Sequence, residues 1–477
     1  MITIVGLGPG SIDDLSLKAW RTIEKTRTLY LRTKRHSCVA EFPNHLKCIS
    51  FDDLSDDPDT IANEIIKVAM SPRDVVYAVP GDPLVGEATV TRLLKLASDD
   101  NIDVEIVNGI SFIEPMLSTI GVSALDGLQI FDALAIAPVY HPPINPEFPA
   151  LVAHVNHQEI ASNVKQTLMN QYPDNFAVKL IHMTGVSAVQ VEDLPLHEIA
   201  GSTQFSTMTA LYLPALGELT SFESFQNIIA QLRSPEGCPW DIKQTHQSLR
   251  QFLIEEAYEV LETIDDNDPD SLVGELGDLL LQIVLHTQIA IDDGEFYMSD
   301  ILREVNEKMI RRHPHVWGDV DVNGDPNQVT ANWDDIKKAE KGDTADTWES
   351  ILDGVPKGAP ALFVSHKYQH KAAKIGFDWD DVSGVQAKAA EEYNEILTAE
   401  SDEERIKEIG DLMFVLVNWL RWLNVEDPES LMREMNAKFY GRFTYVEKQA
   451  TQNGKTLADY SLDEMDMWWN EAKSKGL

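Results

Sequence analysis

The sequence predicts a multidomain protein in which an α/β domain precedes two all-α units. Short strand-like runs alternate with helical patterns up to about residue 213, and after residues 214–219 helical periodicity dominates. Within the helical part, one pattern of acidic residues occurs twice in the same order, which indicates an internal repeat. The chain of 477 residues is long enough for two to four domains with cores of their own.

Charge and composition exclude several classes of partner. The formal net charge is −39 at pH 7, which disfavours binding to nucleic-acid backbones and to anionic lipid, since both need a basic patch. No segment is apolar over a membrane-spanning length, and the first residues resemble a strand rather than a signal peptide. We therefore expect a cytoplasmic protein with no nucleic-acid or membrane partner. The three cysteines lack the spacing of a disulfide framework or a zinc site.

The first element is a buried strand over residues 2–5, followed by the turn Gly6-Leu7-Gly8-Pro9-Gly10 and a helical pattern over 15–23. A glycine-rich turn between strand and helix lets a ligand approach the backbone closely. The third glycine comes too early for a dinucleotide fingerprint, and the next strand, 28–31, ends without a ribose-binding acid. A nicotinamide cofactor is therefore disfavoured.

Two further strands end in similar turns. Residues 74–79 lead into Pro80-Gly81-Asp82-Pro83, and residues 104–107 lead into Asn108-Gly109-Ile110-Ser111. Open α/β sheets bind ligands at the carboxyl ends of their strands. We therefore expect these turns to contribute to one ligand site.

Through these motifs, residues 1–213 resemble the tetrapyrrole (corrin/porphyrin) methylase family. The resemblance implies two α/β lobes with S-adenosylmethionine as a cofactor between them. Five residues would by this resemblance lie near that cofactor: Gly8, Pro9, Gly81, Asp82 and Ser111.

The helical part carries paired acids. Glu256 and Glu259 are three residues apart, as are Glu275 and Asp278, so each pair projects from one face of a helix. Two helices can then present four carboxylates to one point. Carboxylates about 6 Å apart repel by roughly 3 kcal/mol per pair at an effective dielectric constant near 20. A divalent cation removes this repulsion, and oxygen ligands suit Mg²⁺ or Mn²⁺, which also bind substrate phosphates.

The acids have an alternative interpretation as an ordinary solvated helix face, which is the commoner situation for any single pair. Here the acids stand at the edge of apolar runs, 279–285 and 412–417, and they do so twice. This recurrence favours metal ligation. The second set consists of four acids in the same order: Glu392, Glu395, Glu408 and Asp411.

From about residue 222 to the end, the order of these motifs resembles the MazG nucleoside triphosphate pyrophosphohydrolases. The resemblance includes residues 238–246, the acids, and the basic segment 306–316. It also includes residues 354–358, 367–369 and 376–379 in the second unit. With the methylase-like domain in front, the chain resembles the YabN type of fusion. The expected domains are 1–213, a first MazG-like unit at 222–317, a linker at 318–350 with a short helix at 333–341, and a second unit at 351–477.

The resemblance implies a reaction in which water attacks the α-phosphorus of a nucleoside triphosphate and pyrophosphate leaves. The implied metal ligands are Glu256, Glu259, Glu275 and Asp278 in the first unit, and Glu392, Glu395, Glu408 and Asp411 in the second. Glu255 and Glu391 would orient water or a second metal ion. Phosphate charge would be neutralised by four basic residues, Lys308, Arg312, Lys438 and Arg442, and substrate would be bound by Lys367, Gln369 and Trp469.

Three functions remain open at this level. The first is a metal-dependent pyrophosphohydrolase, which the two intact sets of acids favour. The second is an S-adenosylmethionine-dependent methyltransferase for which the helices are a scaffold, and the third is a front domain that senses a ligand and regulates the hydrolase. All-α units of this kind bury apolar helix faces against a partner, so we also expect a homo-oligomer, most simply a dimer.

Overall fold

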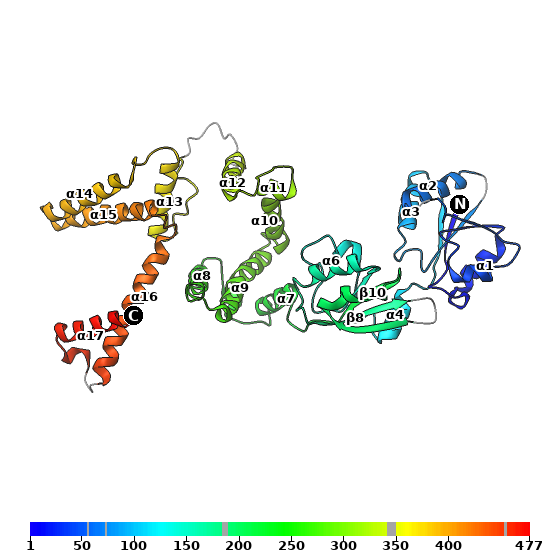
Figure 1. Ribbon diagram of the computed structural model, residues 1–477, viewed down its shortest axis with the longest axis horizontal. Helices are drawn as coiled ribbons and strands as arrows, with labels where there is room; N and C mark the ends of the chain where they lie inside the picture. The colour runs from blue at the N-terminus through cyan, green and yellow to red at the C-terminus, as the bar shows by residue number, and fades with distance from the viewer. Residues whose placement is uncertain (55–56, 72–73, 184–188, 341–349, 453–455) are drawn as a thin grey trace. The chain divides into compact units, whose positions relative to one another are not determined.

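The structure is a computed structural model and describes residues 1–54, 57–71, 74–183, 189–340, 350–452 and 456–477. The chain divides into two compact units, Met1–Asn306 and Glu307–Leu477. Figure 1 shows strands only in the first part of the chain and helices in the rest. Among the described residues, no helix combines the length and the apolar character needed to cross a membrane.

The first lobe is a five-stranded parallel sheet with strand order β3-β2-β4-β1-β5. Its strands are β1 (Ile2–Gly6), β2 (Thr28–Leu31), β3 (Lys47–Ser50), β4 (Val75–Val79) and β5 (Val104–Val107). Its helices are α1 (Leu17–Lys25), α2 (Pro58–Ala69) and α3 (Ala88–Asp99). Helices α2 and α3 pack with Ile2 and Ile4 on one face, and α1 packs with Val5 on the other. The alternating side chains of β1 therefore serve two cores.

The second lobe is a mixed sheet with strand order β6-β7-β10-β8-β9. Its strands are β6 (Gln129–Asp132), β7 (Ala150–Ala153), β8 (Ala177–Met183), β9 (Val189–Pro195) and β10 (Thr209–Leu213). Its helices are α4 (Ile113–Ile120), α5 (Ala133–Ile136) and α6 (Gln158–Leu168). Residues of α5 and α6 form one core with this sheet, and Met116 of α4 packs against Leu151 in another. The predicted two-lobed α/β fold is confirmed.

The first compact unit also contains the first group of helices. They are α7 (Phe222–Arg233), α8 (Arg250–Asp265), α9 (Pro269–Asp293) and the start of α10 (Met298–Arg312). Helices α8 and α9 pack on each other, and α7 packs on α9. Their core contains Ile229 of α7 and Leu285 and Ile289 of α9.

The second compact unit contains helices and no strand among its described residues. It contains α11 (Pro314–Trp317), α12 (Pro326–Glu340), α13 (Ala361–Lys374), α14 (Val382–Thr398), α15 (Asp402–Trp422), α16 (Pro428–Gln452) and α17 (Leu462–Ser474). Helices α14 and α15 lie side by side as a hairpin (Figure 1), α13 packs on α15 and α16, and α17 packs on α16. The predicted change from an α/β domain to helices is confirmed.

The helix of the linker is longer than the sequence analysis suggested. A helical piece was expected at 333–341, whereas α12 begins at Pro326. The side chain of Asp325 accepts a hydrogen bond from the Asn327 backbone N–H at 2.9 Å, and proline is favoured in a first helical turn. Together these two residues start the helix early. Residues 341–349 of the expected linker lie outside the described residues.

Candidate functional site

The second unit holds an acid cluster on the hairpin of α14 and α15. Each helix begins at a polar cap, since the side chain of Asp381 accepts from the Ser383 N–H and that of Ser401 accepts from the Glu404 N–H. Glu392, Glu395 and Glu408 each offer a carboxylate oxygen, and these atoms lie within 4.8 Å of one another. The hairpin therefore brings together acids that are 13 to 16 residues apart in sequence.

Glu392 is the buried member of this cluster, with 4% of its surface exposed. Its Oε1 pairs with the Lys388 Nζ at 2.7 Å, while Oε2 is buried and has no hydrogen-bond partner in the described part of the chain. Lys388 also bonds Glu391 at 3.0 Å. Hydrogen bonds to Glu392 and then Glu391 raise the pKa of Lys388. The sequence analysis missed this lysine, although its position four residues before Glu392 is the spacing of a helical ion pair.

The carboxylates of this cluster repel one another, as expected for acids so close together. The pKa of Glu408 is raised, first by burial of the carboxylate and then by the charge of Glu395, with smaller effects of Glu392 and Asp411. The charge of Asp411 thus acts on Glu408, although Asp411 is not among the three acids whose oxygens lie within 4.8 Å of one another. A cation at this point would reverse the effect.

The first unit holds a matching cluster on α8 and α9. Glu256, Glu259 and Glu275 offer oxygens within 4.8 Å of one another. The pKa of Glu256 is raised, first by burial, then by the charge of Asp278, and also by Glu259 and Glu255. Residue 252, four before Glu256, is phenylalanine, so a residue equivalent to Lys388 is missing from this position.

Of the two predicted basic residues of the first MazG-like unit, Arg312 contacts a residue outside the acid cluster. The Arg312 guanidinium forms a two-pronged pair with Glu340 of α12, at 2.6 Å for its shortest bond, and Arg311 joins it at 2.7 Å. These hydrogen bonds lower the pKa of Glu340 to about 2. Lys308 and Arg312 fall in the compact unit Glu307–Leu477. The acid cluster on α8 and α9 falls in the other compact unit, Met1–Asn306.

Arg442 of α16 and Trp469 of α17 lie together where these two helices pack on each other. The guanidinium is centred 5.7 Å from the ring of Trp469, and Nε donates to the carbonyl oxygen of Leu477 at 2.7 Å. The Trp469 ring also packs on Phe439, with ring centres 5.3 Å apart. Lys438 precedes Phe439 on α16. Arg442, expected to neutralise phosphate, and Trp469, expected to bind substrate, therefore form a cation–π contact with each other.

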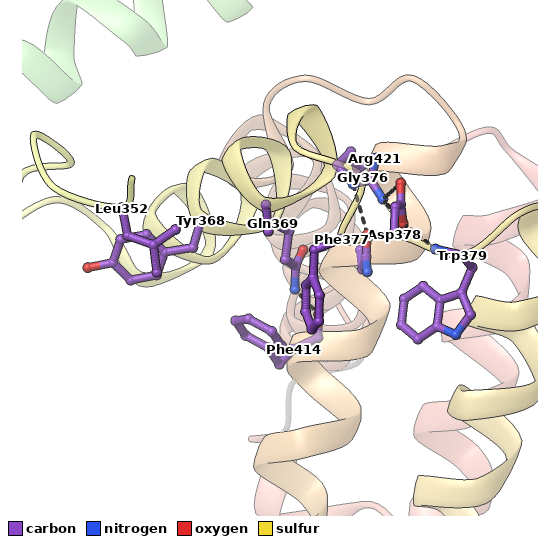
Figure 2. Close-up of a pocket in the computed structure, with 11 residues that line it drawn as sticks. Leu352, Tyr368, Gln369, Gly376, Phe377, Asp378, Trp379, Phe414 and Arg421 are labelled. Atoms are coloured by element: carbon purple, nitrogen blue, oxygen red, sulfur yellow. Dashed lines mark hydrogen bonds and ion pairs between the residues drawn. The ribbon is translucent and has the colours of Figure 1, made fainter. Parts of the chain in front are cut away.

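Lys367 and Gln369 are neighbours on α13, and they face different surroundings. Lys367 is exposed, and its Nζ lies 5.2 Å from the centre of the Phe363 ring. Gln369 is buried and lines a pocket against α15 (Figure 2). Of these two predicted substrate residues, only Gln369 therefore lines this pocket.

In the first lobe, the three predicted turns meet at one edge of the sheet. Strands β4, β1 and β5 are neighbours, and Gly8 and Gly81 exchange backbone hydrogen bonds at 3.2 and 2.8 Å. Asp82 is buried and accepts from the Gly109 N–H at 3.1 Å. A Cβ on Gly109 would lie 2.3 Å from the carbonyl oxygen of Gly81, so only glycine fits this approach.

Pro9 and Ser111 complete the set of predicted cofactor residues. Pro9 follows Gly8, which has a φ of 74°. The Ser111 hydroxyl is buried, accepts from the Ile113 N–H at 3.0 Å and donates to Glu114 at 2.5 Å. All five residues therefore lie on the loops that follow β1, β4 and β5.

Two family profiles match the chain. The one described as "Tetrapyrrole (Corrin/Porphyrin) Methylases" matches residues 1–199, and the one described as "MazG nucleotide pyrophosphohydrolase domain" matches residues 244–317. The "Uncharacterized protein YabN" of Bacillus subtilis (strain 168) is 42% identical over 99% of this chain and 98% of its own length. The chain belongs to the YabN family. It joins a tetrapyrrole methylase domain to a MazG domain, as the sequence motifs predicted.

The helical part of this YabN-family protein has curated relatives that are named for an activity. The "Nucleoside triphosphate pyrophosphohydrolase/pyrophosphatase MazG" of Thermotoga maritima is 44% identical over 53% of this chain and 95% of the relative. The "Nucleoside triphosphate pyrophosphohydrolase" of Escherichia coli (strain K12) is 36% identical over 54% of this chain and 98% of the relative.

Solved structures resemble the YabN-family chain over about half of its length. A uroporphyrin-III-C-methyltransferase from Thermus thermophilus is 17% identical, covers 45% of this chain and 91% of its own, and has a TM-score of 0.37. A diphthine synthase is 16% identical, covers 47% and 94%, and has a TM-score of 0.35.

Proposed function

We propose that this protein hydrolyses nucleoside triphosphates to nucleoside monophosphates and pyrophosphate, in a reaction that depends on Mg²⁺ or Mn²⁺. The observation that carries the proposal is the buried, unpartnered Oε2 of Glu392 within a cluster of carboxylates. The relatives named as nucleoside triphosphate pyrophosphohydrolases over this part of the chain support the reaction type.

The donor set fits a hard divalent cation. Every group in each cluster is a carboxylate, and an ionised carboxylate oxygen that is buried without a partner is unfavourable unless a cation satisfies it. The proposed ligands are Glu392, Glu395, Glu408 and Asp411 in the second unit, and Glu256, Glu259, Glu275 and Asp278 in the first.

A bound Mg²⁺ or Mn²⁺ would neutralise triphosphate charge and make water easier to deprotonate near neutral pH. The exposed carboxylate of Glu391, or of Glu255 in the first unit, would orient this water and accept its proton. The water oxygen bonds to the α-phosphorus, and the bond from that phosphorus to the oxygen bridging to the β-phosphorus breaks. Lys438 and Arg442 are the cations proposed to hold the phosphate oxygens.

The test is release of pyrophosphate and monophosphate from a panel of ribo- and deoxyribonucleoside triphosphates, with Mg²⁺ and with chelator. We expect release only with metal, and loss of at least about a hundredfold in the double variant Glu256→Ala, Glu392→Ala. Glu403→Ala, which removes an exposed acid of α15 outside the cluster, is the matched control. Full activity in the double variant would refute the metal assignment.

The glycine loops of the first lobe favour a second proposal, binding of S-adenosylmethionine by the α/β domain. Buried Asp82 fixes the loops at the ends of β4 and β5, and an added Cβ at Gly81 would meet no atom within 4 Å, so its surface is open to a ligand. Calorimetry with S-adenosylmethionine tests binding, and weakened binding is expected for Gly81→Val. Repeating the hydrolysis assay with saturating S-adenosylmethionine then separates a sensor, which changes the rate, from an independent methyltransferase.

A further inference from the structure

A histidine and an aspartate meet at the carboxyl ends of two neighbouring parallel strands in the second lobe. Asp132 is the last residue of β6, and His154 follows the last residue of β7. The register pairs Asp132 with Ala153, the residue before His154. The Nδ1 of His154 lies 3.1 Å from the Oδ2 of Asp132. The two strand ends therefore present a histidine–carboxylate pair.

The backbone of His154 is in an unusual conformation. Its φ is 62°, in the left-handed region that few residues other than glycine adopt. Two backbone contacts hold the flanking chain, since the Val155 N–H donates to the Thr209 carbonyl oxygen at 2.9 Å and the Leu134 N–H donates to the Oδ1 of Asp132 at 2.9 Å. Strained residues of this kind cluster at functional sites. The conformation therefore indicates a role for the side chain of His154.

The ring of His154 contacts two loops of the α/β domain that are proposed to bind S-adenosylmethionine. Its centre lies 5.8 Å from the centre of the Phe112 ring, and Phe112 directly follows Ser111. Gly86 lies in the loop that follows β4, has a φ of 75°, and would with an added Cβ come within 3.2 Å of the Nε2 of His154. The histidine of the second lobe thus reaches the loops after β4 and β5.

The two nitrogens of this ring have different surroundings. An ionised carboxylate only accepts hydrogen bonds, so the Nδ1 facing Asp132 carries the hydrogen and Nε2 presents a lone pair. No described residue forms a hydrogen bond with Nε2, and 26% of the side-chain surface is exposed. Of the three contacts of the ring, Asp132 is titratable, whereas Gly86 and Phe112 are uncharged. A neutral imidazole held in this way is a general base.

His36 also lies beside the predicted cofactor loops, but both of its ring nitrogens are engaged. Nδ1 lies 3.0 Å from the Sγ of Cys38, and Nε2 lies 3.0 Å from the carbonyl oxygen of Gly8. Burial lowers the pKa of His36. His36 therefore supports the loop after β1, whereas His154 presents a nitrogen to a ligand.

We propose that the Nε2 of His154 accepts the proton of a methyl acceptor bound beside this ring, while Asp132 holds the ring in place. The inference rests on the proposed binding of S-adenosylmethionine, which supplies the methyl group. The nucleophilic nitrogen or oxygen of the acceptor bonds to the methyl carbon, and the bond from that carbon to sulfur breaks with its electron pair left on sulfur. The proton of the acceptor moves to Nε2, and Asp132 stabilises the imidazolium that forms.

This arrangement selects a class of acceptor. The hydrogen on an alcohol, a phenol or an amide nitrogen becomes more acidic as the bond to the methyl group forms, so a base beside it lowers the barrier. A carboxylate or a thioether has no proton to lose and gains nothing from His154. We therefore expect an acceptor whose reacting nitrogen or oxygen carries a hydrogen.

The first test is affinity labelling of the full-length chain with 5′-chloroacetamido-5′-deoxyadenosine. The chloride-bearing carbon of this probe lies close to the position of the methyl group in S-adenosylmethionine. The lone pair of Nε2 displaces chloride from that carbon and forms a nitrogen–carbon bond. We expect peptide mass spectrometry to find the adduct on His154, and excess S-adenosylhomocysteine to prevent it. His36 and His157 are internal controls, and His157→Gln should be labelled normally while His154→Gln is not.

The second test separates the role of Asp132 from simple support of the fold. In Asp132→Asn the amide oxygen is needed to accept from the Leu134 N–H, so the amide NH₂ group faces Nδ1 of His154. The hydrogen of the imidazole then moves to Nε2, which loses its lone pair. We expect labelling to slow at least about tenfold, while calorimetry shows unchanged affinity for S-adenosylhomocysteine.

The outcomes distinguish this inference from the proposal on which it rests. If calorimetry shows that neither S-adenosylmethionine nor S-adenosylhomocysteine binds, both are overturned. If the ligands bind but the adduct forms elsewhere than on His154, the inference alone is overturned. An unchanged labelling rate in folded Asp132→Asn also overturns it, and labelling of the unsubstituted chain decides the matter if that variant does not fold.

Discussion

At the scale of single residues, the acid clusters contain carboxyl groups whose ionised form is unfavourable without a cation. The pKa of Glu408 is raised, first by burial and then by neighbouring acids, so its ionised form is destabilised in the folded chain. For such an acid, stability is lost as pH rises through the raised pKa of the folded state. The ionised cluster is therefore a cost of folding that a bound cation would offset.

We accordingly expect Glu408→Gln to raise the melting temperature of the metal-free protein at pH 7, by about 2 °C. With saturating Mg²⁺ the order should reverse, because the variant loses a ligand. Differential scanning calorimetry with chelator and with Mg²⁺ measures both values. Glu403→Gln is the control, and a variant that melts below the unsubstituted chain in chelator would contradict the repulsion argument.

A second residue-scale prediction concerns the pair of Arg312 and Glu340. The pKa of Glu340 is lowered to about 2 from the ordinary value of 4.5, so the pair stabilises the fold above pH 4.5 and this contribution disappears as pH falls toward 2. Glu340→Gln should lose that part of the pH dependence. Melting curves of both proteins between pH 2 and pH 6 test it, and identical slopes would show that the pair adds nothing.

At the scale of elements, the turns after β1, β4 and β5 depend on close backbone contact. An added Cβ at Gly109 would lie 2.3 Å from the Gly81 carbonyl oxygen, whereas one at Gly201 would meet nothing within 4 Å. We therefore expect Gly109→Ala to destabilise the α/β domain by about 2 kcal/mol and Gly201→Ala to be nearly neutral. Urea unfolding followed by circular dichroism measures the difference. Equal midpoints would mean that the loop relaxes without strain.

The sequence predicted the strands of the first lobe that local patterns decide. The strand at Thr28–Leu31 and the strand at Val104–Val107 were predicted with the bounds that the structure shows. The approach of the acids to one another was predicted because their spacing puts each pair on one face of a helix, and a hairpin brings two such faces together. The predicted start of α12 was wrong, because the helix is started by the cap of Asp325 and by the proline that follows it. Both lie upstream of the apolar pattern on which the prediction depended.

The pocket lined by Gln369 could not be predicted from spacing alone. Gln369 was singled out as a substrate residue, but its contact with Phe414 joins helices 45 residues apart in sequence. The Asp378 and Arg421 pair is similarly distant, and neither residue was assigned a role. Periodicity shows which face a residue occupies on its own helix and not which face of another helix it meets. Assigned roles such as those of Lys438 and Trp469 remain predictions.

At the scale of the whole molecule, the second unit leaves apolar side chains of α14 and α15 exposed. Tyr393 and Leu397 on α14, and Ile409 and Met413 on α15, are each at least 44% exposed. We expect a second copy of the chain to cover this face, as the sequence suggested. Sedimentation velocity should show a dimer that Ile409→Glu weakens at least about tenfold, while Leu125→Glu, in a loop of the α/β domain, has no effect. A monomeric unsubstituted chain would refute the expectation.

The two acid clusters differ in the residue four positions before their buried or half-buried glutamate, which is Lys388 in the second cluster and Phe252 in the first. The second carboxylate cluster carries a tethered ammonium that already balances part of its charge, and the first has a hydrocarbon ring at that place. A cation entering the proposed sites would compete with the lysine in one cluster and with water alone in the other. The two clusters would then fill at different magnesium concentrations. One protein would thus show a graded dependence of metal binding on ion concentration.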